Sequence, residues 1–261
     1  MLLVIEVGNT NTKVGVFARG ASDHRLLVSW RLTTRREQTA DEYGVFIETL
    51  LKTRGIEAAQ IRGIAISNVV PPVQQALEWM SERYFGITPF TAQPGVNVDV
   101  PLLVDVPREV GADRLVKVVA GIALHGAPLI IIDFGTATTF DCVNARGEFV
   151  GGAIAPGMVV ASEALVSRAA RLYRVELVRP ATAIGKNTGT NIQSGVIFGW
   201  AGLADSLVER MRAELGGAAR VVATGGLAPQ MHGVARSIDT VDPDLALQGL
   251  RILWERDHPE G

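Results

Sequence analysis

Two turns in this 261-residue chain place a carboxylate two residues before a glycine and hydroxyl or amide side chains just after it. Glu6 precedes Gly8 in EVGNTNTK, and Asp133 precedes Gly135 in IDFGTATT. Backbone N–H groups and hydroxyls that converge on one point bind phosphate oxygens. A carboxylate beside that point completes, with water and phosphate, the oxygen shell of Mg²⁺. The two turns together predict a binding site for the β- and γ-phosphates of a nucleotide.

Either turn alone is explained equally well as an ordinary hairpin turn, because Gly, Asn and Thr are common turn formers. The two turns, however, match at a constant offset of 127 residues, which also aligns Thr12 with Thr139. A third glycine-rich turn, ATGGLA at 223–228, follows an apolar pair and precedes an expected helix. Glycines there let a flat base approach the backbone. The combination favours a nucleotide site, with the third turn at its adenosine end.

A further carboxylate, Asp113, lies in GADR at 111–114, directly after a proline-rich stretch and at the start of an expected helix over 110–125. A capping role for Asp113, with Arg114 as its partner, explains this position without any chemistry. Beside ATP, however, a carboxylate can accept the proton of an alcohol as its oxygen attacks the γ-phosphoryl group. Asp113 is therefore the candidate catalytic base.

The elements around these motifs alternate between strand and helix. We expect a hairpin of strands at 2–5 and 13–17, and an irregular connection through four prolines over 88–107. Further strands are expected at 26–32, 61–70 and 128–134, and helices at 40–54, 73–85 and 110–125. The repeated acid-glycine hairpin predicts two similar α/β domains, residues 1–115 and 116–261, facing each other across a cleft.

Composition excludes several classes of protein. A net charge of -2 and 48% hydrophobic residues argue against a nucleic-acid binder and against disorder. One cysteine excludes an internal disulfide and a cysteine-based zinc site, and the four histidines lack metal-ligand spacing. No apolar run is long enough to span a membrane, and the first residues lack a signal peptide's pattern. We therefore expect a cytoplasmic enzyme.

Several motifs together resemble the type III pantothenate kinases. They are EVGNTNTK, SNVVPP at 67–72, PREVGADR at 107–114, IDFGTATT at 132–139, GGAIAPG at 151–157, KNTGTNIQSG at 186–195, and ATGG. The likeness runs in order along nearly the whole chain. That family belongs to the acetate and sugar kinase, Hsp70 and actin superfamily, in which two ribonuclease-H-like domains clamp ATP. The resemblance therefore agrees with the internal repeat.

The resemblance implies that the chain phosphorylates the terminal hydroxyl of pantothenate with ATP and Mg²⁺, the first step of coenzyme A biosynthesis. It implies Asp113 as the proton acceptor, Asp133 as the ligand of a monovalent cation, K⁺ or NH₄⁺, and Thr136 as an ATP contact. Thr188 maps to a substrate contact that reaches the site from the partner subunit of a homodimer. The first phosphate loop comprises Glu6, Val7, Gly8, Asn9, Thr10, Asn11, Thr12 and Lys13, and the pantothenate loop comprises Gly111, Ala112, Asp113 and Arg114.

Two positions depart from the family's pattern. Glu6 stands where Asp is usual, which moves the carboxylate about 1.5 Å further into the site and is expected to weaken activity. Val104 stands where a Tyr that contacts pantothenate is usual. These departures raise the alternative of a weak or inactive nucleotide-binding regulator, against which Asp113 argues. A phosphatase or ATPase of the same superfamily is the other alternative, and ATP hydrolysis without pantothenate would reveal it.

Overall fold

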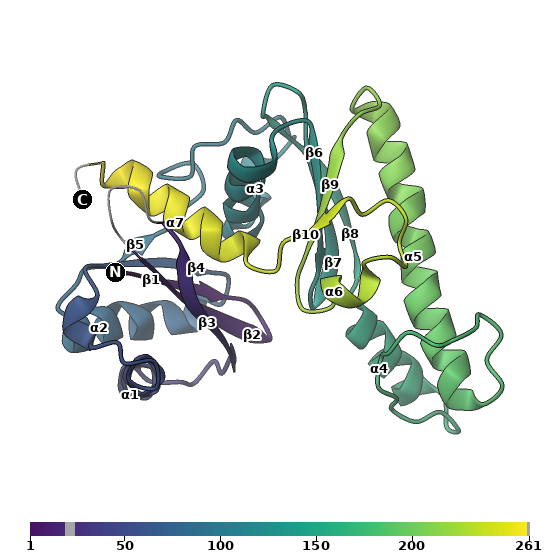
Figure 1. Cartoon of the computed structure of the whole chain (residues 1–261), viewed down its shortest axis with the longest axis horizontal. Coiled ribbons are helices and arrows are strands. Elements are labelled where there is room, and N and C mark those ends of the chain that lie inside the picture. Colours follow the sequence, from purple (N-terminus) through teal and green to yellow (C-terminus); the bar gives the residue numbers. More distant parts are fainter. Residues whose placement is uncertain (19–23, 260–261) are drawn as a thin grey trace. The chain divides into compact units, whose positions relative to one another are not determined.

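The computed structural model describes residues 1–18 and 24–259, which divide into two compact units (Figure 1). Unit 1 comprises Met1–Asp99, Arg108–Ala120 and Ala246–Gly261, and unit 2 comprises Val100–Pro107 and Gly121–Leu245. The boundary expected between residues 115 and 116 falls inside helix α3 (Ala112–His125), and the C-terminal helix α7 (Leu245–Asp257) groups with unit 1. Local patterns do not show this division because the chain returns to unit 1 after completing unit 2.

Unit 1 contains a five-stranded sheet in the order β3-β2-β1-β4-β5. Strands β1, β2 and β3 are antiparallel neighbours, whereas β4 and β5 run parallel to β1. Their bounds are β1 Leu2–Val7, β2 Asn11–Phe17, β3 Leu26–Thr33, β4 Gly63–Asn68 and β5 Phe90–Thr91. The expected hairpin is confirmed, and the stretch at 88–107 holds only the short β5 and the 3-10 turn Pro107–Glu109.

Helices cover both faces of this sheet, which explains why LLVIEV is almost continuously apolar. Leu3 and Ile5 pack in a cluster with α1 (Ala40–Lys52) and α2 (Gln74–Phe85). On the other face α7 lies close to the strands, since a Cβ on Gly15 would come within 2.9 Å of Leu247. Short 3-10 turns, Ala58–Gln60 and Pro71–Val73, precede β4 and α2.

Local signals account for the ends of these helices. Thr39 and Glu42 form a capping box at the start of α1, with each side chain bonded to the backbone of the other. Pro71 and Pro72 precede α2, and Gly86, with φ of 67°, ends it in the left-handed conformation. The expected helices at 40–54 and 73–85 are therefore confirmed to within a few residues.

Unit 2 repeats the same sheet in the order β10-β9-β6-β7-β8. Its strands are β6 Leu129–Phe134, β7 Ala137–Val143, β8 Phe149–Pro156, β9 Arg220–Thr224 and β10 Thr240–Val241. Strands β6, β7 and β8 are antiparallel, and β9 and β10 run parallel to β6. The shared order and directions confirm the predicted duplication of a ribonuclease-H-like α/β unit.

The two hairpins differ by one residue in their turns. Glu6 pairs with Lys13 across β1 and β2, whereas Asp133 pairs with Thr139 across β6 and β7. The structural counterpart of Thr12 is therefore the equally buried Thr138, and the ungapped match of Thr12 with Thr139 was wrong. A turn that is shorter by one residue shifts the register of the whole following strand.

Three helices complete unit 2: α4 (Met158–Arg168), α5 (Thr188–Glu214) and the short α6 (Ala228–Met231). Figure 1 shows α5 running beside the sheet, and its residues Ile192 to Val208 share a cluster with Ile130 and Ile132 of β6. The opposite face meets α3, because a Cβ on Gly121 would lie 2.5 Å from Leu129. The turn at 223–228 joins β9 to α6, as expected.

Candidate functional site

The first phosphate loop of unit 1 is the tip of the β1–β2 hairpin. Glu6 and Val7 end β1, Gly8, Asn9 and Thr10 make the turn, and Asn11, Thr12 and Lys13 begin β2. The N–H of Gly8 donates to the carbonyl of Asn11 at 3.0 Å, which closes the turn. Asn9, Thr10 and Asn11 are exposed, so their side chains are available to a ligand.

A residue outside the motif, Thr34, ties this loop to the end of β3. Its hydroxyl donates to the carbonyl of Gly8 at 2.8 Å and lies 2.9 Å from the hydroxyl of Thr12. Its N–H donates to the carbonyl of Thr10 at 3.0 Å. Sequence reasoning missed Thr34, because its partners lie more than twenty residues away along the chain. Three bonds to one turn hold the loop in a single conformation.

Tyr43 of α1 lies beneath the same loop and is almost completely buried. Burial raises the pKa of its phenol, although the neighbouring Thr12 hydroxyl acts in the opposite direction. The phenol therefore stays neutral at physiological pH and adds no charge next to the loop.

The second acid-glycine turn, in unit 2, packs Asp133 among glycines. A Cβ on Gly225, whose φ is 92°, would lie 2.3 Å from Oδ1 of Asp133, and one on Gly135 would lie 3.3 Å from it. The turn closes through the N–H of Gly135, which donates to the carbonyl of Ala137 at 3.1 Å. Thr136, at its tip, is exposed. The second and third glycine-rich turns therefore meet at the Asp133 carboxylate and form a cradle around it, in which position 225 has room only for glycine.

The pantothenate loop expected at 111–114 begins α3 in unit 1. The carbonyl of Gly111 accepts from the N–H groups of Arg114 and Leu115 at 3.2 and 3.3 Å. Asp113 folds back over Gly111, since a Cβ there would lie 2.6 Å from its Oδ1. The Asp113 side chain is 32% exposed, so an incoming alcohol can reach it. Ala112 is buried and anchors this turn to the core.

Sequence reasoning also missed Lys117, one helical turn after Asp113. Its Nζ lies 3.9 Å from Oδ2 of Asp113, and only 3% of the residue is exposed. The i, i+4 spacing was visible in the sequence, but burial of a lysine is not a local property.

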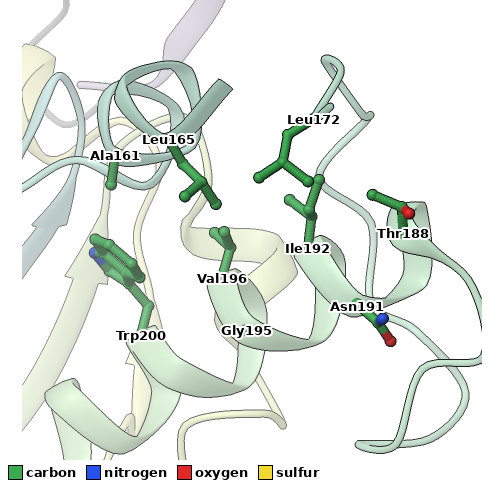
Figure 2. Close-up of a pocket in the computed structure, with 9 residues that line it drawn as sticks. All are labelled: Ala161, Leu165, Leu172, Thr188, Asn191, Ile192, Gly195, Val196 and Trp200. Atoms are coloured by element: carbon green, nitrogen blue, oxygen red, sulfur yellow. The ribbon is translucent and has the colours of Figure 1, made fainter. Parts of the chain in front are cut away.

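Thr188 is the first residue of α5, in unit 2, where Asn187 and Thr190 form a capping box. It lies at one end of an apolar groove of about 490 Å³ between α4 and α5, with Trp200 towards the other end (Figure 2). Leu165, Leu172, Ile192 and Val196 line the groove between them. The indole of Trp200 donates to Thr138 and to the carbonyl of Pro156, each at 3.2 Å.

Val104 belongs to unit 2, where its side chain lies against Gly151. The GADR turn belongs to unit 1, and the loss of a pantothenate contact at Val104 stays a prediction.

The described part of the chain contains neither a cluster of metal ligands nor a membrane-spanning helix. Across residues 1–18 and 24–259, no three or more His, Cys, Asp or Glu side chains cluster in a way that would hold a metal ion. Among the same residues, no helix combines the length and the apolar character needed to cross a membrane.

Comparison with known proteins identifies the family. A family model described as type III pantothenate kinase matches residues 2–210. The chain is 48% identical over 257 residues to the type III pantothenate kinase of Geobacter sulfurreducens, covering 98% of this chain and 99% of that one. It is 47% identical over 258 residues to the type III pantothenate kinase of Myxococcus xanthus, covering 99% of each chain.

A solved structure supports the fold. The activator of the 2-hydroxyisocaproyl-CoA dehydratase from Clostridium difficile, with bound ADPNP, superposes with a TM-score of 0.51 at 10% identity, over 100% of this chain and 98% of that one. Likeness at this identity concerns the fold alone, and it agrees with the duplicated sheets. From the family match and the identities over almost the full length, we conclude that this chain belongs to the type III pantothenate kinase family.

Proposed function

We propose that this chain transfers the γ-phosphoryl group of ATP to the terminal hydroxyl of pantothenate and produces 4′-phosphopantothenate and ADP. The observation that carries the proposal is the identity of 48% over 98% of the chain to a type III pantothenate kinase. The structure adds a partly exposed carboxylate, Asp113, at the start of α3 and beside Gly111.

In the proposed reaction, the carboxylate of Asp113 accepts the proton of the pantothenate hydroxyl. The hydroxyl oxygen forms a bond to the γ-phosphorus, and the bond from that phosphorus to the β–γ bridging oxygen breaks, so that ADP leaves. A positioned base of this kind contributes a factor of about 100 to 10,000. The Gly111 turn places this carboxylate at the start of α3.

Two of the predicted turns are assigned to ATP. We assign residues 6–13 of unit 1 to the phosphates and Thr136 of unit 2 to a further ATP contact. Thr34 supports the first turn, because its three hydrogen bonds fix the backbone that would face the phosphates. Rigid support of this type keeps binding groups in register with the reacting atoms.

Two carboxylates fit the cations that the family implies. Glu6, an oxygen donor at the first loop, is assigned to hydrated Mg²⁺, and Asp133, in its glycine cradle, to K⁺ or NH₄⁺. Hard oxygen donors suit both kinds of ion. When bound, the cations supply positive charge to the phosphates.

The proposal is tested by measuring ADP release and phosphopantothenate formation by mass spectrometry, with ATP, Mg²⁺ and pantothenate, with and without K⁺. The expected result is equal amounts of both products, and no ADP when pantothenate is left out. Asp113→Asn should lower kcat by a factor of about 100 or more. ADP release without pantothenate at the full rate would indicate an ATPase, and no turnover with either cation would refute the proposal.

We further propose that the chain acts as a homodimer in which Thr188 completes the partner's pantothenate site. Gly195, Gly199 and Gly202 support this, because they lie exposed along α5 and an added Cβ would meet nothing within 4 Å. Exposed Val159 and Val160 on α4 add apolar surface. Small and apolar residues of this kind allow close helix packing between subunits.

Mixing two defective variants tests whether Thr188 of one subunit acts in the pantothenate site of its partner. Thr188→Ala should raise KM for pantothenate and leave the Kd of ATP unchanged. A heterodimer of Thr188→Ala with Asp113→Asn then contains one site with both residues intact, so the mixture should be more active than either variant alone at low pantothenate. If Thr188 serves its own subunit, every site is defective and the mixture shows no gain.

A further inference from the structure

Lys117 is a lysine in the interior of unit 1 that no role assigned above explains. It lies on α3, four residues after Asp113, so both side chains are on the same face of the helix. Its Nζ is 3.9 Å from Oδ2 of Asp113. Only 3% of Lys117 is exposed, whereas the Asp113 side chain is 32% exposed. The ammonium therefore reaches the candidate base from the protein interior, on the side away from solvent.

A buried ammonium is expensive, because it loses its hydration and regains only part of that energy from its partners. Replacing a buried ion pair with apolar side chains of similar volume is frequently neutral or stabilising. Leu115, Val116 and Val118, the neighbours of Lys117 on α3, are completely buried and apolar. A lysine at this position therefore places a positive charge beside Asp113 that an apolar side chain would not supply.

The two oxygens of the Asp113 carboxylate have different surroundings. Oδ1 lies against Gly111, at 2.6 Å from the point where a Cβ would stand, and Oδ2 is the oxygen nearest to Lys117. At 3.9 Å the contact is an electrostatic attraction rather than a hydrogen bond. The low exposure of Lys117 strengthens this attraction, because little water screens its charge. Lys117 therefore attracts one oxygen of the Asp113 carboxylate, and the missing side chain of Gly111 leaves the space that the other oxygen occupies.

We infer that Lys117 is a positioning residue for phosphoryl transfer, which holds the carboxylate of Asp113 in the orientation that accepts the substrate's proton. This inference rests on the proposed function, because it gives Asp113 the role of base. Lys117 itself contacts neither substrate in this scheme. Its removal should lower kcat more than it changes KM, since the oriented base matters in the transition state and hardly in binding.

The test compares Lys117→Met with Lys52→Met. Methionine keeps most of the lysine's length and removes its charge. Lys52 is a matched control, because it too is paired at i, i+4, with Glu48 at 3.5 Å on α1, but its side chain is 61% exposed. We expect Lys117→Met to lower kcat by a factor of about 10 to 100 and to leave the KM of ATP within about twofold. Lys52→Met should keep wild-type kinetics.

A double-mutant cycle separates positioning from a general structural effect. In the Asp113→Asn background there is no base to orient, so adding Lys117→Met should leave the residual kcat unchanged. Lys117→Gln serves as a second variant if Lys117→Met folds poorly. The inference is overturned if both Lys117 variants keep the wild-type kcat, or if Lys117→Met lowers kcat by the same factor with and without Asp113.

Failure of the proposed function has a different signature. If the wild-type dimer releases no ADP with pantothenate, or if Asp113→Asn keeps full activity, the assignment of Asp113 is wrong and the role of Lys117 is lost with it. If wild type and Asp113→Asn behave as proposed and only the Lys117 results differ, the positioning role alone is refuted.

Discussion

The contact between Gly111 and Asp113 makes a sharp prediction for Gly111→Ala. Gly111 is not among the glycines with positive φ, so its backbone accepts alanine. The new Cβ would stand 2.6 Å from Oδ1 of Asp113, whereas ordinary contact begins at 3.4 Å. The carboxylate must therefore move by about 0.8 Å. Because a misplacement of about 1 Å costs about 100-fold, we expect kcat to fall by a factor of about 10 to 100.

The same substitution should hardly affect stability. The atom that must yield is the end of a partly exposed side chain, so it can swing towards solvent without disturbing the core. We expect the free energy of unfolding to change by less than about 1 kcal/mol. The assay measures kcat by coupled ADP release and stability by urea unfolding.

The control for this prediction is the double variant with Asp113→Asn. Without a carboxylate to displace, Gly111→Ala should have no further effect on the residual kcat. Wild-type kcat in the single variant would refute the view that the position of the Asp113 carboxylate limits the reaction. A large loss of stability would instead show that Gly111 is needed for the helix start.

Three further predictions concern the rest of the molecule. Glu6→Gln should raise the KM of MgATP and lower kcat, whereas Glu6→Asp, the residue usual in the family, should raise kcat/KM by about tenfold. Steady-state kinetics and complementation of a cell lacking pantothenate kinase measure both effects, and a slower Glu6→Asp enzyme would contradict this prediction. Thr34→Val removes the hydrogen bonds to Gly8 and Thr12, so we expect the free energy of unfolding in urea to fall by about 1–2 kcal/mol and ATP to bind more weakly in calorimetry. Unchanged ATP binding would refute the proposal that Thr34 supports the loop. Burial raises the pKa of Asp205, but a hydrogen bond from the backbone N–H of Ser237 and the charge of Arg236 outweigh it, so the pKa is lowered overall. Its stabilisation is therefore present above the unfolded pKa and lost as the pH falls through the folded pKa, so Asp205→Asn should destabilise at pH 7 and make no difference in strong acid, as followed by urea unfolding at both pH values.

The parts of the site that follow short, continuous motifs were predictable. EVGNTNTK, IDFGTATT and GADR each carry their own turn residues, and the structure places each of them at a strand end or helix start. Thr34 and Lys117 were not predictable as parts of the site. Thr34 is joined to Gly8 across 26 residues, and the burial of Lys117 depends on elements that are distant in sequence.

The internal repeat likewise could not predict the register in which the strands of the second hairpin pair. Similar residues at a constant offset revealed the duplication, but they could not show that the second turn is one residue shorter. In the structure Asp133 pairs with Thr139, whereas Glu6 pairs with Lys13. Only this difference in pairing revealed that Thr138 corresponds to Thr12. Strand register is set by backbone hydrogen bonds between two segments, and a one-residue change leaves the composition of either segment almost unaltered.

By itself, the sequence determined the duplicated α/β architecture and the positions of the turns, because hydrophobic periodicity and turn chemistry are local properties. The family followed from the resemblance of its motifs. The tertiary structure alone decided which residues support those turns, and it returned the C-terminal helix α7 to unit 1. These features depend on burial and on contacts between segments far apart in the chain. Such contacts form only when the whole chain has folded, so no local pattern encodes them.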